Sequence, residues 1–201
     1  MARLAGSNGK ATAKAIHKHS LELIARHGFA AVSMRMIADA VGVQPGALYQ
    51  YHPTKQALLL DIMQKHLEAL LKAWAKEKES ETELPAIEAL ERFARFHIRY
   101  NIKRPDEVFI AYMELRSLEP EEFKLIEELR RQYEDELKTI IANGIKENSF
   151  KVEDAHVTAM ATLAMLTGIN TWYRTGGRLS QKKIEDIYVN MVLRSVGCAK
   201  D

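Results

Sequence analysis

Cysteine is almost missing from this sequence of 201 residues, in which Cys198 stands alone. A single cysteine excludes an internal disulfide and the usual cysteine-rich zinc patterns. No run of about 18 apolar residues occurs, so we expect no transmembrane helix. The first residues, MARLAGSNGKATAKA, carry charges but no continuous apolar segment, which is not the pattern of a secretory signal. These absences favour a cytoplasmic protein without a membrane partner.

Net charge is also small, at +2, but it is unevenly distributed. Residues 1–55 contain seven lysine and arginine residues against two acidic residues, a net charge of +5, so residues 56–201 carry −3. A basic head on a mildly acidic body suits an anionic partner at one end of the molecule.

Alternating strand patterns are absent, and apolar residues recur with the period of a helix along nearly the whole chain. The sequence therefore predicts an all-α fold. Gly28 and Gly42 are expected to end helices, Ser33 to cap one, and Pro45 to stand in a first turn. The predicted helices cover residues 11–27, 34–40, 44–51, 54–78, 86–102, 106–118, 121–147, 153–173 and 181–196.

Two helices joined by a tight glycine turn, the second very short, have the arrangement of a helix-turn-helix unit. Gly42 frees the backbone in the turn, while Val43 and Leu48 fill the small core. Small residues at Gly46 and Ala47 allow the backbone of the short helix to approach another surface closely. Such a helix fits the major groove of DNA, which is about 12 Å wide.

Residues 28–63, GFAAVSMRMIADAVGVQPGALYQYHPTKQALLLDIM, closely resemble the DNA-binding domain of the tetracycline-repressor (TetR) family. The sequence departs from the family pattern at Pro53 and at His52, where phenylalanine is usual. The histidine predicts a partly polar ring at the junction with the fourth helix. The matching positions are Gly28, Phe29, Ser33, Ile37, Ala38, Gly42, Val43, Gly46, Leu48, Tyr49, Tyr51 and Lys55.

The resemblance implies a role for each matching polar position. Ser33 would donate to a DNA phosphate at the start of the second helix, and Tyr51 and Lys55 would hold phosphates and fix the register. The side chains that would face base edges or nearby sugars are Arg35, Gln44, Pro45, Gly46, Ala47 and Tyr49. Lys10 and Lys14, with an arm containing Arg3, would add attraction that weakens with salt.

Each of these positions also has a purely structural interpretation. Ser33 can be only a helix cap, and Arg35 can pair with Asp39 on a solvated face. Tyr49 and Tyr51 can be half-buried rings. The motif as a whole favours the DNA-binding interpretation for the tyrosines.

The pattern of residues 85–196 predicts about five helices, which are enough to form a separate helical bundle. In the TetR family this part holds the ligand and the dimer interface, so the resemblance implies a DNA-binding domain over 1–54 and a ligand-binding and dimerisation domain over 55–201. The segment 153–173 is apolar on most faces, so we expect it to lie between other helices. The side chains expected inside are Val157, Met160, Ala161, Leu163, Ala164, Leu166, Thr167, Asn170 and Trp172.

Methionines and aromatic residues that line a space can adapt to an apolar guest. For each of them the alternative is plain core packing. His97 and Asn170 are polar residues in apolar stretches and need hydrogen-bond partners. The ligand-binding candidates are Phe93, His97, Phe109, Met113, Met160, Leu163, Thr167, Asn170, Trp172 and Arg174.

Residues 168–197, GINTWYRTGGRLSQKKIEDIYVNMVLRSVG, are similar to the C-terminal end of TetR-type repressors of fatty-acid and steroid catabolism, several of which respond to acyl-CoA thioesters. Thr175 replaces the usual proline. The similarity implies a ligand with a long apolar part and an anionic part, for which Arg174 and Arg178 are candidates. The last helix and the apolar side of 153–173 predict a four-helix homodimer interface, with Ile184, Ile187, Tyr188, Met191, Val192 and Ser195.

The favoured function is a ligand-responsive transcriptional repressor that binds a palindromic operator of double-stranded DNA as a dimer. A small apolar effector, such as a fatty acyl-CoA or related thioester, would release it. The alternatives are an activator or a co-repressor-dependent regulator with the same head, and, less favoured, a helical enzyme acting on thioesters.

Enzyme motifs are absent: there is no nucleophile elbow, no HExxH and no phosphate-binding glycine loop. Glu114, the nearest approach to a buried acid, is expected to pair with an arginine, such as Arg116 or one on a neighbouring helix. We therefore expect no enzymatic activity, no cofactor and no metal.

Overall fold

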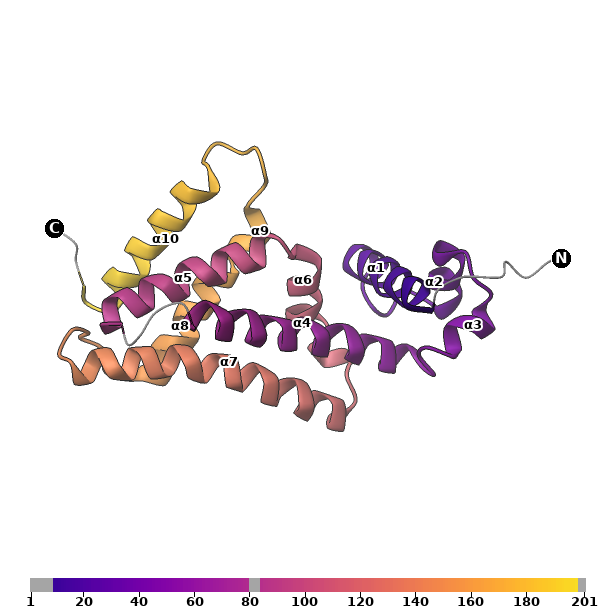
Figure 1. Cartoon of the computed structure of the whole chain (residues 1–201), viewed down its shortest axis with the longest axis horizontal. Helices are drawn as coiled ribbons and strands as arrows, with labels where there is room; N and C mark the ends of the chain where they lie inside the picture. The colour runs from indigo at the N-terminus through magenta and orange to yellow at the C-terminus, as the bar shows by residue number, and fades with distance from the viewer. Residues whose placement is uncertain (1–8, 80–83, 199–201) are drawn as a thin grey trace. The chain divides into compact units, whose positions relative to one another are not determined.

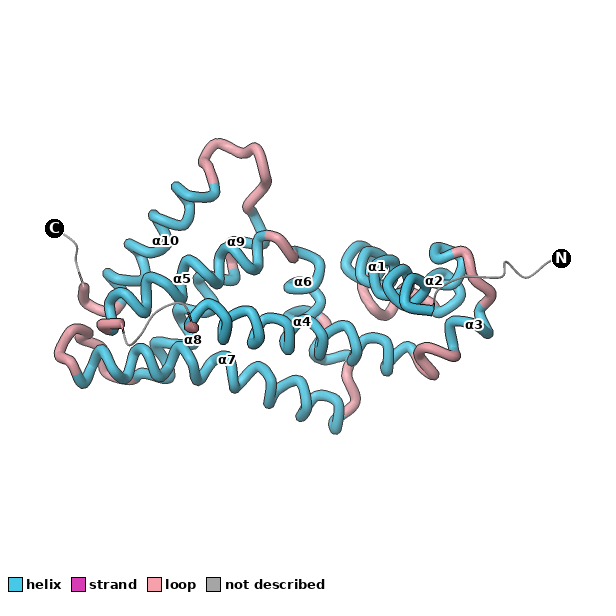
Figure 2. The backbone as a smooth tube through the Cα atoms, viewed as in Figure 1, coloured by secondary structure: helices cyan, strands magenta, loops and turns pink. Residues whose placement is uncertain are grey.

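The computed structural model describes residues 9–79 and 84–198, and all regular secondary structure in these residues is helical (Figures 1 and 2). The predicted all-α fold is confirmed. None of the described helices is long and apolar enough to cross a membrane. The elements are α1 (Gly9–His27), α2 (Met34–Val41), α3 (Pro45–Tyr49), α4 (Lys55–Lys78), α5 (Ala86–Ile102), α6 (Pro105–Met113), a 3₁₀ turn η1 (Leu115–Ser117), α7 (Pro120–Lys146), α8 (Ala155–Thr167), α9 (Ile169–Trp172) and α10 (Gln181–Ser195).

The helix boundaries in the head follow from local side-chain and backbone chemistry. Ser33 is the N-cap of α2, and its Oγ accepts a hydrogen bond from the Met36 amide at 3.2 Å. Gly28 ends α1 and Gly42 ends α2, with φ angles of 79° and 77° that a residue with a Cβ rarely adopts. The predicted cap and both predicted stops are confirmed.

Two predicted helices are interrupted in the structure. The segment 106–118 ends as an α-helix at Met113 and continues as η1, and the segment 153–173 divides into α8 and α9 at Gly168. At the second break, Asn170 Nδ2 donates to the Thr167 carbonyl and Thr171 Oγ1 to the Gly168 carbonyl. Side chains that bond to these carbonyls compete with the regular helical pattern.

The chain forms two compact units. In the first unit, the described residues 9–67 and 106–127 include the three helices of the head, the first half of α4, and α6. Leu48 is fully buried in the head, as predicted, and so are Ile37 and Ala38, whereas Val43 is only half-buried. The first compact unit thus contains part of α4, α6 and the start of α7 in addition to the head. The functional division between residues 54 and 55 stays a prediction.

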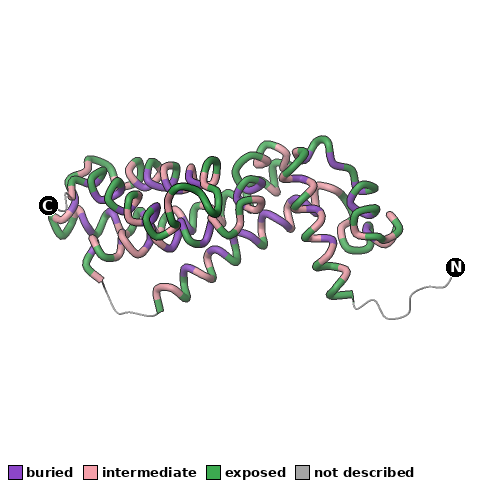
Figure 3. Tube along the Cα trace, turned by 90° about the horizontal axis from the view of Figure 1, so that it is seen from above, coloured by how far each residue is buried: buried purple, intermediate pink, exposed green. Residues whose placement is uncertain are grey.

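The second unit, with described residues 68–79, 84–105 and 128–198, has an aromatic core. Trp74 of α4 packs edge-on against Phe93 of α5, with ring centroids 5.0 Å apart, and Tyr133 of α7 lies 5.2 Å from the same ring. Trp74 Nε1 donates to Glu136 at 3.1 Å, so its polar atom is satisfied at the edge of the core. Buried residues recur along the helical trace (Figure 3), as amphipathic helices require.

Candidate functional site

The short helix α3 presents one open face. Leu48 points inward and is fully buried, while Tyr49 on the same helix has 49% of its surface exposed. Gln44 and Gly46 are exposed, and Pro45 and Ala47 are half-buried. A Cβ built on Gly46 would meet nothing within 4 Å, so the backbone here is accessible to a large partner. The candidate base-reading side chains of α3 therefore lie on the solvent side of the head.

The second helix adds two candidate residues to this surface. Ser33 is exposed while it caps α2, and Arg35 in the next turn is exposed as well. The alternative in which Arg35 pairs with Asp39 is not seen, since the two make no ion pair among the residues that the structure describes. Tyr51 is also exposed, and its hydroxyl donates to the Gly9 carbonyl at 3.4 Å. Lys14 is exposed, whereas Arg3 lies outside the described residues.

Lys55 has partners that sequence reasoning did not foresee. Its Nζ donates to the carbonyls of Phe29 and Val32, both at 2.9 Å, and lies 4.2 Å from the centre of the Phe29 ring. These contacts hold the connection between α1 and α2 in place. The geometry gives Lys55 a structural role, and its contact with a phosphate stays a prediction.

Glu114, which comes much later in the sequence, also holds this connection. Its Oε1 accepts from the Phe29 amide at 2.9 Å, and its Oε2 accepts from Ser117 Oγ at 2.9 Å. The predicted pairing with an arginine such as Arg116 is wrong, because a backbone amide and a hydroxyl satisfy the carboxylate instead. Phe29 and Glu114 are 85 residues apart, and no sequence pattern connects them.

His52 lies in the connection between α3 and α4, where a partly polar ring was expected. Its side chain is 15% exposed, and its Nε2 is 3.9 Å from Asp61 Oδ2 on α4, where Lys65 also binds Asp61 at 2.7 Å. Burial lowers the pKa of His52, and the Asp61 charge only partly offsets this. Burial also lowers the pKa of His17 on α1, with the Lys65 charge acting in the same direction.

The ligand-binding candidates do not all lie in one place. Phe93, His97 and Leu163 are buried in the second unit, where Met160, Thr167 and Asn170 are half-buried. Arg174 is exposed. Phe109 and Met113 belong to the first unit and are exposed there.

His97 is the centre of a buried polar group inside the aromatic core. Its Nδ1 lies 3.1 Å from the Tyr133 hydroxyl, and its Nε2 lies 3.0 Å from Thr167 Oγ1. Asn101 Nδ2 donates to the same Nε2 at 2.8 Å, while Asn101 Oδ1 is buried without a hydrogen-bond partner among the described residues. Sequence reasoning missed Asn101, although its spacing of four residues from His97 places both on one face of a helix.

The predicted interior location of helix 153–173 is wrong for one of its faces. Val157 is 64% exposed and Trp172 is 49% exposed, and Ala161 and Ala164 are exposed as well. The helix buries only the side that carries Ala159, Thr162, Leu163 and Leu166, and α8 packs against α5. The other apolar side is left uncovered in the single chain.

Helix α10 has a similar uncovered face. Ile184 and Val192 are buried in the chain's own core, and Tyr188 is half-buried against Trp172, with nearly parallel rings 6.3 Å apart. Ile187 and Met191 are exposed. Of the residues predicted to form the dimer interface, Ile184 and Val192 thus belong to the chain's own core, whereas Ile187 and Met191 lie on its surface.

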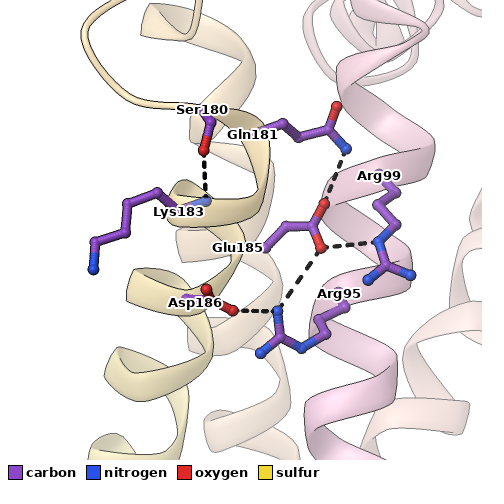
Figure 4. Close-up of polar contacts among 7 residues, drawn as sticks. All are labelled: Arg95, Arg99, Ser180, Gln181, Lys183, Glu185 and Asp186. Atoms are coloured by element: carbon purple, nitrogen blue, oxygen red, sulfur yellow. Dashed lines mark hydrogen bonds and ion pairs between the residues drawn. The ribbon is translucent and has the colours of Figure 1, made fainter.

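Two hollows border α10. The first, of about 460 Å³, brings the predicted Arg174 and Arg178 together with Trp172 and Tyr173. The second, of about 510 Å³, lies between α5 and α10 and was not foreseen from the sequence. In it the buried Glu185 accepts from Arg99 Nε at 2.8 Å and from Gln181 Nε2 at 2.9 Å, and Arg95 Nη1 donates to Asp186 at 2.6 Å (Figure 4).

Within the described part of the chain, no three histidine, cysteine, aspartate or glutamate side chains are grouped so as to hold a metal ion. The lone Cys198 donates its Sγ proton to the Ser149 carbonyl at 2.9 Å, which is a structural contact near the end of the described chain.

Two family models match the sequence. The model described as bacterial regulatory proteins, tetR family, matches residues 16–62, and the model described as tetracyclin repressor-like, C-terminal domain, matches residues 83–196. The second match alone covers more than half of the chain. The first match ends within α4, and the second begins before α5.

Individual relatives support the same grouping. The transcriptional repressor KstR2 of Rhodococcus jostii (strain RHA1) is 25% identical over 173 residues, which are 85% of this chain and 84% of the relative. A regulatory protein of the tetR family from Rhodococcus RHA1 is 26% identical, with a TM-score of 0.86 over 94% of this chain and 98% of that one. AibR, solved in complex with isovaleryl coenzyme A and operator DNA, is 25% identical, with a TM-score of 0.82 over 90% and 97% of the two chains. KstR2 is a transcriptional repressor, the Rhodococcus RHA1 protein is a regulatory protein, and AibR binds operator DNA.

Proposed function

The chain belongs to the tetracycline-repressor (TetR) family of bacterial regulatory proteins, and we propose that it is a repressor that binds a palindromic operator as a homodimer and leaves it when a small apolar effector binds. In this proposal residues 1–54 are the DNA-binding domain, and residues 55–201 bind the effector and form the dimer. The observation that carries it is the open face of α3, with Gln44, Gly46 and Tyr49 accessible above the fully buried Leu48.

The contacts with DNA follow from the chemistry of that face. Arg35 suits a guanine edge and Gln44 an adenine edge, while Tyr49, Pro45 and Ala47 supply apolar contact. Ser33 and Tyr51 suit phosphate oxygens, which position the head without reading sequence. Lys55, whose ammonium already binds two carbonyls, reaches a phosphate in this proposal only by sharing its remaining N–H.

The homodimer is supported by the uncovered apolar faces of α8 and α10. Val157, Ile187 and Met191 are large apolar side chains that a single chain leaves in water. Two copies related by a two-fold axis would cover these faces with each other and would place two heads on the two halves of a palindrome.

The effector proposal is supported by the relatives and by the second unit. AibR was solved with isovaleryl coenzyme A, and we propose that this chain likewise binds a fatty acyl-CoA or related thioester. The aromatic core contains a polar cluster formed by His97, Thr167 and Asn101. The Asn101 Oδ1 atom, which has no hydrogen-bond partner among the described residues, would accept a hydrogen bond from a hydroxyl or amide of the ligand. Helix α4 contributes residues to both units, so an effector that displaces it would alter the head. A coupling of about 1–3 kcal/mol would weaken DNA binding by about 5- to 150-fold.

The test selects duplexes from a random DNA pool with the full chain and then measures binding of the selected fragment by fluorescence anisotropy, with and without acyl-CoA thioesters of increasing chain length. We expect a palindromic fragment, and release by one class of thioester. Binding that strengthens with thioester would indicate a co-repressor-dependent regulator. Failure to select any duplex at low ionic strength would refute the DNA-binding proposal itself.

A further inference from the structure

We propose that the hollow between α5 and α10 is a binding site for phosphate groups of a small molecule, with Arg99, Arg95 and Lys182 as the side chains that hold the anion. We refer to this hollow, lined by Arg95, Arg99, Gln181, Lys182, Glu185 and Asp186, as the α5–α10 cleft. Its volume of about 510 Å³ lies within the range of ordinary ligand pockets, which is about 300–1,000 Å³.

The floor of the cleft is the buried carboxylate of Glu185, which has only 3% of its surface exposed. It accepts from Gln181 Nε2 and Arg99 Nε, and Arg95 Nη1 lies 3.9 Å away (Figure 4). A carboxylate held by several partners fixes the guanidinium of Arg99 in one orientation. A guanidinium that binds an anion through two N–H groups must be held in position by neighbouring residues, and Glu185 does this for Arg99.

The outer donors of the two arginines are available to a ligand. Arg99 uses only Nε, and its two terminal nitrogens make no hydrogen bond or ion pair within the residues that the structure describes. Arg95 uses only Nη1, which leaves Nε and Nη2. A guanidinium with two adjacent free N–H groups matches the spacing of two phosphate oxygens.

Charge in the cleft favours an anion. Three cations face two carboxylates, so the six lining residues carry a net charge of +1. The hydrogen bond from Arg95 is the largest cause that lowers the pKa of Asp186, so this carboxylate keeps its negative charge at neutral pH beside the three cations. Lys182 forms no close ion pair with a described residue. The two arginines already balance the two carboxylates of the cluster. Lys182 is the additional cation, and its charge is the one that a phosphate would attract.

The position of the cleft is compatible with the dimer. The residues of α10 that line it are Gln181, Lys182, Glu185 and Asp186, whereas Ile187 and Met191 belong to the uncovered apolar face. The cleft residues alone supply the donors and the charge for phosphate binding. That the phosphate belongs to the effector, for example to the nucleotide end of a coenzyme A thioester, rests on the proposed function.

The experiment measures binding of pyrophosphate, coenzyme A and pantetheine to the full chain by isothermal titration calorimetry at low and moderate salt. The informative variants are Lys182→Gln, which breaks no hydrogen bond in the protein, and Arg99→Lys, which keeps a charge beside Glu185 but removes the planar fork. Lys183→Gln is the matched control, because this neighbouring lysine extends away from the cleft (Figure 4).

We expect pyrophosphate and coenzyme A to bind, and pantetheine, which lacks the nucleotide phosphates, to bind more weakly than coenzyme A. Lys182→Gln and Arg99→Lys should each weaken pyrophosphate binding at least about fivefold, since each removes a charged hydrogen bond, while Lys183→Gln should stay within about twofold. Equal effects of Lys182→Gln and Lys183→Gln, or no pyrophosphate binding at low salt, would overturn the proposal.

Release from DNA separates this proposal from the proposed function. If pyrophosphate and coenzyme A bind through Lys182 but no thioester releases the DNA, the site stands and the effector assignment fails. If a thioester releases the DNA equally from the wild-type chain and from Lys182→Gln, and pyrophosphate does not bind, the regulator stands and the cleft is structural.

Discussion

Leu48 and Tyr49 are neighbours on α3, and the structure separates what they do. Leu48 is fully buried beneath the helix, whereas Tyr49 is half in water. A substitution of Leu48 should therefore affect folding, whereas a substitution of Tyr49 should affect the surface that faces a binding partner. For single residues, the sequence correctly predicted the helix end at Gly42, the N-cap at Ser33 and the burial of Leu48, because these depend on local backbone conformation and packing.

Tyr49→Ala should weaken binding of the selected DNA fragment by about tenfold or more, because a contact with a base edge contributes about 1–3 kcal/mol. The thermal midpoint should remain nearly unchanged, since the ring is largely in water. Anisotropy titrations and a melting curve measure both effects. Phe123→Ala, a similarly exposed ring on α7, is the control and should leave DNA binding intact. A tyrosine variant that melts earlier but binds DNA normally would contradict the prediction.

At the scale of elements, the connection between α1 and α2 depends on two side chains from elsewhere in the chain. Lys55 binds its carbonyls and Glu114 binds its amide. Neither contact was visible in the sequence, since helical periodicity indicates which face is apolar but not which distant carboxylate reaches a turn. The same limit explains the error at Val157 and Trp172: an apolar stripe looks the same whether its own chain or a second copy covers it.

Glu114→Ala should lower the free energy of unfolding by about 1–3 kcal/mol, because the Phe29 amide loses its acceptor in a partly buried setting. Glu114→Gln keeps a carbonyl oxygen for that amide and should recover most of the loss. Urea unfolding of the three proteins gives the comparison. Equal losses for alanine and glutamine would show that the negative charge, and not the hydrogen bond, is what matters.

The uncovered faces of α8 and α10 yield a second prediction at this scale. Met191→Glu should shift the dimer toward monomer by at least about tenfold in the dissociation constant, since it places a charge in an apolar interface. Sedimentation velocity over a range of concentrations measures this. Asn143→Glu on α7, an exposed position away from these faces, is the control. A Met191→Glu variant that dimerises normally would mean that another surface pairs.

At the scale of the whole molecule, the sequence predicted the fold class and the family, but not how residues that are distant in the chain come together. The polar group around His97 and the α5–α10 cleft each join helices separated by more than thirty residues. The proposed dimer and the proposed effector each involve a second molecule, and the amphipathic pattern of one helix does not specify that molecule.

Stability of the first unit should decrease as the pH falls through about 6.5. Burial lowers the folded-state pKa of both His17 and His52, so the unfolded chain binds protons first. The contribution is fully present above about pH 7 and is lost on acidification toward the folded pKa values. Urea midpoints between pH 5 and 8 test this. His52→Phe should flatten the profile, while His19→Gln, which replaces a more exposed histidine of α1, should not.

The carboxylate of Glu114 has a practical consequence for engineering. A fragment that stops at the end of the family's N-terminal match, near residue 62, would leave the Phe29 amide without its natural acceptor. Such a fragment should therefore be less stable than the same residues in the full chain. Chimaeras that join residues 9–62 to a different C-terminal domain should also carry residues 106–127, or should be redesigned at the end of α1 so that the Phe29 amide has another acceptor.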